Sequence, residues 1–179
     1  MEQHDNGTRK DLVKYRIRSA KEDLKSAQIL LEAGSLKSAN NRAYYAIFHA
    51  INAIHALHGA GYKRHKDAIA NFNKEYVKTE IFPREIGRRI SEAEEIRHAS
   101  DYDDFYIATV DEAKRQIETA DMFLTLVETY CQEQLEDQIS PKLLMRYRNS
   151  VRVTELKKVV VTTTLEVRTP SCPIFLDMM

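Results

Sequence analysis

Apolar residues recur at helical spacing through most of the first 135 residues, in steps of three and four positions. Thr8-Arg9-Lys10-Asp11 and Thr109-Val110-Asp111-Glu112 each place a carboxylate three residues after a threonine, which is the pattern of a capping box at a helix start. Gly34 is a stop signal after the first helix, and Pro83 is a start signal for a later one. The pattern therefore predicts four long helices and a shorter one over 65–76.

The second predicted helix, over 36–58, is apolar on two sides. One side consists of alanines and the other of large residues such as Tyr44, Ile47 and Ile51. A helix of this kind must be covered on both sides, by the interior of the domain or by another subunit. With short links between the helices, we expect an all-α fold, an antiparallel up-and-down four-helix bundle.

The character of the chain changes near Ser140-Pro141. Beyond it lies a run rich in β-branched residues, Val159–Val167, which favours a strand. Residues 1–137 have 20 basic and 24 acidic side chains, whereas residues 138–179 have 7 and 3. We therefore predict a helical bundle over 1–138 and a C-terminal extension over 139–179, which forms one strand or stays mobile.

Composition excludes several classes of protein. The 27 basic and 27 acidic residues cancel, so net charge gives no argument for nucleic-acid binding. Two cysteines make no disulfide framework, and no apolar run is long enough for a signal peptide or a membrane span. A cytoplasmic protein with no membrane attachment is expected. Phosphate-binding and metalloprotease motifs are absent, and we expect no cofactor.

Histidines and basic residues supply the first candidate sites. His55, His58 and His65 are close enough in sequence for a metal cluster, but histidines at a helix end more often cap or face solvent, so no metal site is predicted. A basic run follows the second predicted helix, and it consists of Lys63-Arg64-His65-Lys66. These four residues are candidates for binding nucleic-acid phosphates; the alternative is that they only face solvent.

Arg42 is a charge among apolar residues, and it needs a partner if it is buried. It belongs to a structural ion pair or to a site, and the sequence favours neither. His49 lies seven residues further along, so the two are on roughly the same side of the predicted helix. Both are candidate nucleic-acid-binding residues.

Arg97 is the only basic residue between Glu92 and Glu112, among eight acidic ones. We expect carboxylates to hold it, with Tyr102 nearby. An arginine, a histidine and a tyrosine near a helix end have the chemistry to stabilise a phosphoryl charge and to move a proton. The same residues also have the chemistry to tie a loop to a helix end. The candidate catalytic residues are Arg97, His98, Asp101 and Tyr102.

Several of these segments occur in an order that resembles a known family. The first segment is Asn41-Arg42-Ala43-Tyr44-Tyr45-Ala46-Ile47-Phe48-His49-Ala50. Three further segments follow it in order: Gly61 with His65-Lys66, then Tyr76-Val77-Lys78-Thr79, then Arg97 with Ser100-Asp101-Tyr102. Over about residues 9–135 the chain resembles the HEPN domain, in its small stand-alone prokaryotic branch. The alanine- and tyrosine-rich string is the most specific part of this resemblance.

The resemblance implies a helical bundle that forms a homodimer and that is often paired with a minimal nucleotidyltransferase in toxin–antitoxin systems. Many such proteins are metal-independent ribonucleases, with an arginine followed after four to six residues by a histidine. Arg97 matches the arginine. The histidine is absent, because the positions four to seven residues beyond Arg97 hold Asp101, Tyr102, Asp103 and Asp104, and His98 is adjacent to Arg97 instead.

Two hypotheses of different class follow. In the first, the chain is an RNA-directed toxin, in which Arg97 stabilises the scissile phosphate and Asp101, Tyr102 or His98 assists. In the second, it is a non-catalytic dimeric module that binds nucleotide, RNA or a nucleotidyltransferase, and Arg97 with Asp101 forms a structural ion pair.

Overall fold

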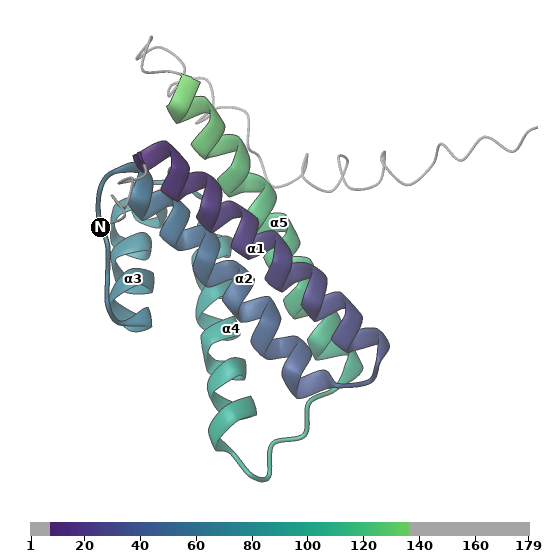
Figure 1. Ribbon diagram of the computed structural model, residues 1–179. Helices are drawn as coiled ribbons and strands as arrows, with labels where there is room; N and C mark the ends of the chain where they lie inside the picture. The colour runs from purple at the N-terminus through teal and green to yellow at the C-terminus, as the bar shows by residue number, and fades with distance from the viewer. Residues whose placement is uncertain (1–7, 137–179) are drawn as a thin grey trace, which may run out of the picture. The chain divides into compact units, whose positions relative to one another are not determined.

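The computed structural model describes residues 8–136, and the described part is all-α. The predicted bundle of four long helices with a short additional helix is confirmed (Figure 1). The helices are α1 (Arg9–Glu32), α2 (Leu36–Leu57), α3 (His65–Phe72), α4 (Arg84–Tyr102) and α5 (Val110–Glu136), with a π-helical turn η1 (Asn73–Val77) directly after α3.

Local sequence signals set most helix ends. The Thr8 hydroxyl accepts a hydrogen bond from the Asp11 backbone, and the Asp11 carboxylate accepts one from the Thr8 backbone, so the first capping box is complete. Gly34 follows α1 with φ 73°, a conformation that suits glycine best. At the start of α5 the Thr109 hydroxyl accepts a hydrogen bond from the Glu112 backbone N–H. The Glu112 carboxylate accepts hydrogen bonds from Tyr106 and Asn40, and not from the Thr109 backbone as a full capping box requires.

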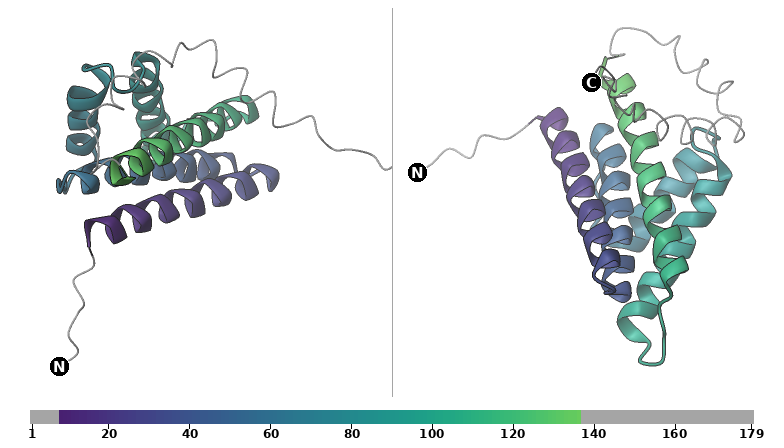
Figure 2. Two further views of the ribbon diagram at one scale, coloured as in Figure 1. Left: turned by 90° about the horizontal axis from the view of Figure 1, so that it is seen from above. Right: turned by 90° about the vertical axis from the view of Figure 1, so that its right-hand side faces the viewer.

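Helix α2 is the centre of the bundle, because it contacts α1, α3, α4 and α5. Its alanines and its large apolar residues are both buried, so the domain itself covers the two sides of the helix. Figure 2 shows α1 and α5 running along α2, with α3 and α4 on the remaining side. The two-sided apolar pattern of α2 is therefore explained without a second subunit.

An aromatic cluster closes one end of the core. Phe72 contacts Phe82 and Phe123 at 5.4 Å between ring centroids, and Tyr76 lies against Tyr130. The predicted helix over 65–76 changes at Asn73 from an α-helix into the π-helical turn. Gly87 of α4 permits this turn to come close, because an added Cβ would lie 3.0 Å from Val77 Cγ1.

The predicted C-terminal extension over 139–179 lies outside the described residues, and the boundary near residue 138 stays a prediction. Within residues 8–136, none of the helices combines the length and the apolar character that crossing a membrane requires.

Candidate functional site

One side of α2 presents polar residues that belong to the bundle yet stay partly exposed. Asn41, Arg42, Tyr45 and His49 form this surface, which we call the α2 polar face. Their spacing of one, three and four positions places them on the same side of the helix. Side chains from α1, α3 and α4 complete the surface, so its chemistry depends on four helices.

Arg97 lies on α4 at one edge of the α2 polar face. Its Nη2 atom is 2.9 Å from Asp101 Oδ2, and its guanidinium lies over the rings of Tyr44 and Tyr102 at 5.9 and 5.6 Å. Burial opposes its charge, but a hydrogen bond with Tyr45 and the charge of Asp101 outweigh burial and raise the pKa of Arg97. The arginine is thus fixed as a cation, with 20% of its side chain exposed.

The surroundings of Arg97 leave polar groups unsatisfied. Arg97 Nε, Ser100 Oγ and Asn41 Oδ1 are buried and have no hydrogen-bond partner among the described residues. The Asn41 amide nitrogen donates to Asp101 Oδ1 at 2.5 Å, so this carboxylate is held from two sides. A buried polar group without a partner costs stability, which is typical of places that serve a ligand or a reaction.

A second group of charges meets around Asp23 of α1. Arg42 Nη1 donates to Asp23 Oδ1 at 2.9 Å, and His49 Nε2 lies 3.5 Å from Asp23 Oδ2. On the other edge of the imidazole, Arg16 Nη1 lies 3.5 Å from His49 Nδ1. Because a guanidinium only donates, Nδ1 of His49 accepts and Nε2 holds the proton that faces Asp23. Burial lowers the pKa of His49. The negative charge of Asp23 raises this pKa, and the positive charges of Arg16 and Arg42 lower it further.

Tyr45 joins the two groups of charges. The Arg42 guanidinium lies 4.7 Å from the centroid of the Tyr45 ring, and the Tyr45 hydroxyl is a hydrogen-bond partner of Arg97. Both arginines therefore lie on one aromatic side chain of α2. The arrangement is rich in donors and positive charge, which suits a phosphodiester.

His65, the first residue of α3, is stacked on Phe48 with ring centroids 3.7 Å apart. Its Nδ1 atom is 3.1 Å from the Tyr44 hydroxyl. Burial lowers the pKa of His65, and the positive charge of Arg97 adds to this effect. Burial also raises the pKa of Tyr44, so this residue remains a phenol at neutral pH. A neutral imidazole thus lies within the electrostatic reach of Arg97.

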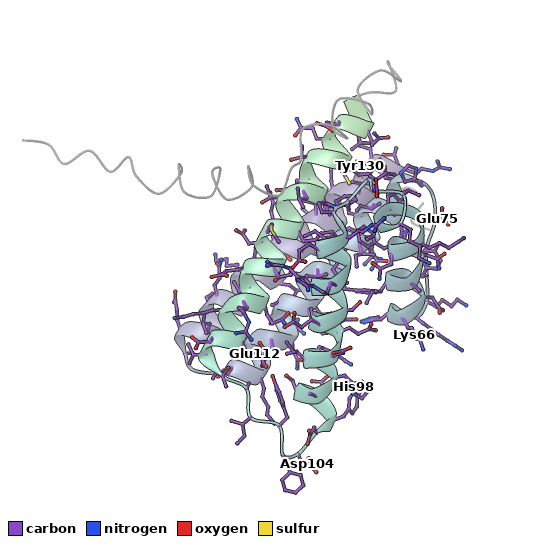
Figure 3. The ribbon with its side chains drawn as sticks, turned by 180° about the vertical axis from the view of Figure 1, so that it is seen from behind. Lys66, Glu75, His98, Asp104, Glu112 and Tyr130 are labelled. Carbon is purple, nitrogen blue, oxygen red and sulfur yellow. The ribbon has the colours of Figure 1, made fainter. Side chains whose placement is uncertain are left out.

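The structure brings together some predicted site residues and separates others. Arg97, Asp101 and Tyr102 form one cluster, and His65 is coupled electrostatically to its arginine. His98 is exposed on α4, and its ring contacts Tyr102 with centroids 4.7 Å apart (Figure 3). The remaining basic candidates, which are Lys63, Arg64 and Lys66, are exposed around the start of α3.

Arg42 and His49 do meet, because each contacts Asp23. Asp23 is a site residue that the sequence pattern did not single out. The sequence did indicate that a buried Arg42 needs a carboxylate partner, but it did not indicate which carboxylate that partner is. Among the described residues no three His, Cys, Asp or Glu side chains are arranged to hold a metal ion.

Comparison with known proteins identifies the family. The model of the HEPN domain family matches residues 13–130. A UPF0332 protein from Thermotoga maritima is 33% identical over 117 residues, which are 65% of this chain and 89% of that protein. A protein from Methanocaldococcus jannaschii named "Putative toxin MJ0605" is 32% identical over 117 residues, or 65% of this chain and 87% of that protein.

A solved structure shares the fold. The crystal structure of TT1696 from Thermus thermophilus matches with a TM-score of 0.57 and 20% identity, over 65% of this chain and 96% of that one. At this identity the likeness concerns the fold alone. Because the family model covers most of the helical bundle, the chain belongs to the HEPN domain family.

Proposed function

We propose that the chain is a toxin-type protein that acts on RNA in the cytoplasm, with Arg97 as the residue that binds the phosphodiester. The observation that supports this most is the state of Arg97, a cation that lies against Tyr44, Tyr45 and Tyr102 and keeps 20% of its side chain exposed. The positive charge of this side chain would attract a phosphate oxygen. The toxin names of two relatives from M. jannaschii agree with such a role.

Cleavage of RNA without a metal ion requires a defined set of steps. The 2′ oxygen attacks phosphorus, the bond from phosphorus to the 5′ oxygen breaks, and one proton leaves the 2′ hydroxyl while another reaches the 5′ oxygen. Arg97 would stabilise the charge that builds up on the phosphate oxygens. Asp101 is engaged by Arg97 and Asn41, and is therefore a poor group for proton transfer.

His65 is the better group for moving the proton. Its pKa is lowered, so the imidazole is neutral at physiological pH and has a lone pair to offer. The Tyr44 hydroxyl is able to accept the proton of Nδ1, and in that tautomer Nε2 is the free acceptor. In this proposal His65 takes the role of the histidine that is absent after Arg97.

Growth and RNA integrity after induced expression test this proposal. Wild type and Arg88→Ala, an exposed arginine of the same helix, are expected to arrest growth and deplete total RNA. Arg97→Ala is expected to do neither while keeping the helical circular dichroism of wild type. Arrest by Arg97→Ala at the wild-type rate would refute the role of Arg97.

A second pair of variants tests the histidine. His65→Gln is expected to reduce RNA loss by about two orders of magnitude, the usual contribution of a general base. His58→Gln, at an exposed position directly after α2 and outside the α2 polar face, serves as its control and is expected to retain activity. Equal loss in both variants, or in neither, would contradict the assignment of His65.

A non-catalytic binding module is the second candidate, and the ion pair between Arg97 and Asp101 at 2.9 Å favours it. If the chain is such a binding module, expression of wild type should leave RNA intact and growth normal. Single-stranded RNA or a minimal nucleotidyltransferase should bind to the purified chain. Arg97→Ala would then weaken binding, or lower stability as expected when a partly buried carboxylate loses its partner.

A further inference from the structure

Tyr45 of α2 lies between the two groups that the proposed cleavage of RNA uses. Its ring contacts the ring of His65 edge-on, with centroids 5.8 Å apart and an angle of 88° between the planes. Its hydroxyl is a hydrogen-bond partner of Arg97, and the residue is partly exposed. A phosphate held by Arg97 would therefore meet the Tyr45 hydroxyl and the His65 imidazole on the same surface.

The hydroxyl of Tyr45 has a proton to donate. A guanidinium only donates hydrogen bonds, so in the bond with Arg97 the phenolic oxygen of Tyr45 is the acceptor. The O–H of Tyr45 is not used in this bond, and it is therefore able to point at a substrate oxygen. Tyrosine is one of the side chains that transfer protons in enzymes when they are placed beside the reacting group.

The charges around Tyr45 suit the tyrosinate that remains after its proton has left. Arg97 donates to the oxygen that would hold the negative charge. Arg42 lies over the face of the ring, with its guanidinium carbon 4.7 Å from the centroid. Asp23 offsets part of the charge of Arg42, so Arg97 contributes more. Cations that are already in place stabilise such a transient charge without reorganisation during the reaction.

Cleavage of a phosphodiester needs a proton donor for the 5′ oxygen as well as a base for the 2′ hydroxyl. We propose that Tyr45 is this donor, a catalytic residue that acts together with Arg97 and His65; the inference rests on the proposed function. The 2′ oxygen forms its bond to phosphorus while His65 Nε2 takes the 2′ proton. As the bond from phosphorus to the 5′ oxygen breaks, the Tyr45 O–H proton moves to that oxygen. The imidazolium then returns its proton to the tyrosinate through water, so both residues regain their starting state.

Two other tyrosines near Arg97 fit this role less well. Tyr44 is buried, with 2% of the residue exposed, and its hydroxyl is already engaged by His65 Nδ1 at 3.1 Å. Tyr102 is also a hydrogen-bond partner of Arg97, but it is 67% exposed and its ring contacts His98. Tyr45 combines the contact with Arg97, the contact with the proposed base and access from solvent.

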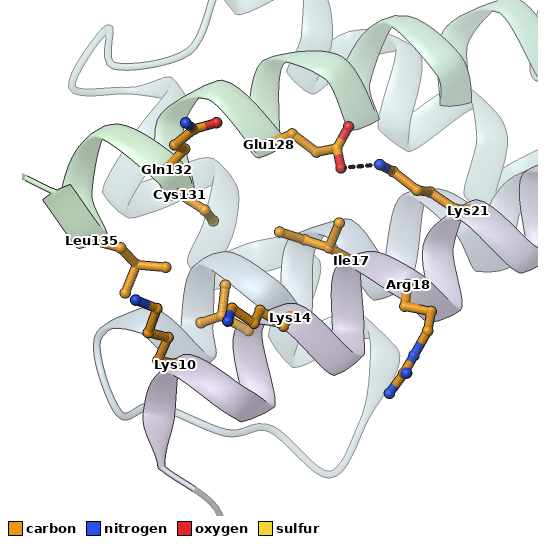
Figure 4. A pocket seen from close by; sticks show the side chains of 10 residues that line it. Lys10, Lys14, Ile17, Arg18, Lys21, Glu128, Cys131, Gln132 and Leu135 are labelled. Carbon is orange, nitrogen blue, oxygen red and sulfur yellow. Dashed lines mark ion pairs between the residues drawn. The ribbon is translucent and has the colours of Figure 1, made fainter.

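The positive groove between α1 and α5 does not offer an equivalent set of groups. Figure 4 shows the cations along it, which include Lys10, Lys14 and Arg18. Neither a histidine nor a tyrosine occurs among the described residues that line it, and its carboxylate, Glu128, is paired with Lys21 at 2.5 Å. Without a histidine these residues lack a group that takes up a proton near neutral pH. The reaction therefore belongs on the α2 polar face.

An RNA with sulfur in place of the 5′ oxygen at one linkage tests the role of Tyr45. In this single-stranded substrate, and in its oxygen counterpart, all other riboses are 2′-deoxy, so only the one linkage is cleavable. Tyr45→Phe keeps the ring under Arg42. It should cleave the oxygen substrate at least about a hundredfold more slowly than wild type, with KM nearly unchanged. Sulfur leaves as a thiolate without a proton, because thiols are much stronger acids than alcohols, so both proteins should cleave the sulfur substrate at similar rates.

Matched variants separate proton donation from a structural role. His65→Gln lacks the base, which sulfur does not replace, so it should stay slow with both substrates. Tyr15→Phe removes the hydroxyl of an exposed tyrosine of α1 and should match wild type with both. Equal cleavage of the oxygen substrate by wild type and Tyr45→Phe, or rescue by sulfur in Tyr102→Phe instead of Tyr45→Phe, would overturn the assignment while the proposed function stands. A wild type that cleaves neither substrate would overturn both.

Discussion

Asp23 shows how a single residue sets the chemical state of the α2 polar face. Its carboxylate contacts both Arg42 and His49, while Arg16 lies on the far side of the same imidazole. The side chain of Asp23 is only 15% exposed, so water screens these interactions weakly. His49 is therefore placed between one group that favours its protonated form and another that opposes it.

Two substitutions should move the pKa of His49 in opposite directions. Asp23→Asn removes the charge that raises this pKa, so the pKa should fall further below its ordinary value. Arg16→Gln removes a charge that lowers it, so the pKa should rise. Titration of the His49 ring protons by NMR measures both shifts, and Glu32→Gln on the same helix should cause neither. Shifts of the same sign in the two variants would contradict the geometry.

At the scale of one element, α2 combines close packing with the polar face. Ala43, Ala46 and Ala50 are fully buried, and such small side chains let neighbouring helices come close. The polar residues occupy the remaining side of the helix, where α1, α3 and α4 supply Asp23, His65 and Arg97. The position of the site thus depends on how closely α2 is packed.

Enlarging one of these alanines should destabilise the bundle. Ala43→Leu adds three carbon atoms where no space exists, and the expected loss in free energy of unfolding is about 1–3 kcal/mol. Ala70→Leu on the exposed side of α3 is the matched control and should change stability by less than about 0.5 kcal/mol. Urea denaturation measures both values. An equal effect of the two substitutions would show that the alanine side of α2 is not tightly packed.

Helices were predictable from the sequence because their signals are local. The helical period, the Thr8 capping box and Gly34 all act within a few residues, and they gave both ends of the first two long helices to within one or two positions. The end of α4 was predicted too early, because the helix continues beyond Arg97 to Tyr102. The site was less predictable, because its contacts join distant residues: Arg42 meets Asp23 nineteen positions away, and His65 meets Phe48 from the next helix. The pattern marked Arg42 and Arg97 as charges in need of partners without identifying all of those partners.

For the molecule as a whole, one buried histidine and three less buried ones link folding to pH. His49, His55, His58 and His65 all have lowered pKa values, and burial is the largest cause in each. His55 is the most buried, with 3% of the residue exposed and its Nε2 atom 3.0 Å from the Ala68 carbonyl oxygen. His49 and His55 belong to α2, His58 caps the end of that helix, and His65 begins α3.

Stability should therefore decrease as the pH falls from 7.5 to 5.5. In the unfolded chain these histidines recover their ordinary pKa near 6.5, so below that value the unfolded state binds more protons than the folded state and is favoured. Carboxylates titrate mainly below this window, which isolates the histidine contribution. Free energies of unfolding at several pH values measure the slope. His55→Gln, which keeps a hydrogen-bond donor, should flatten it, whereas His98→Gln on the exposed part of α4 should not. A slope that is unchanged by His55→Gln would place the proton uptake elsewhere.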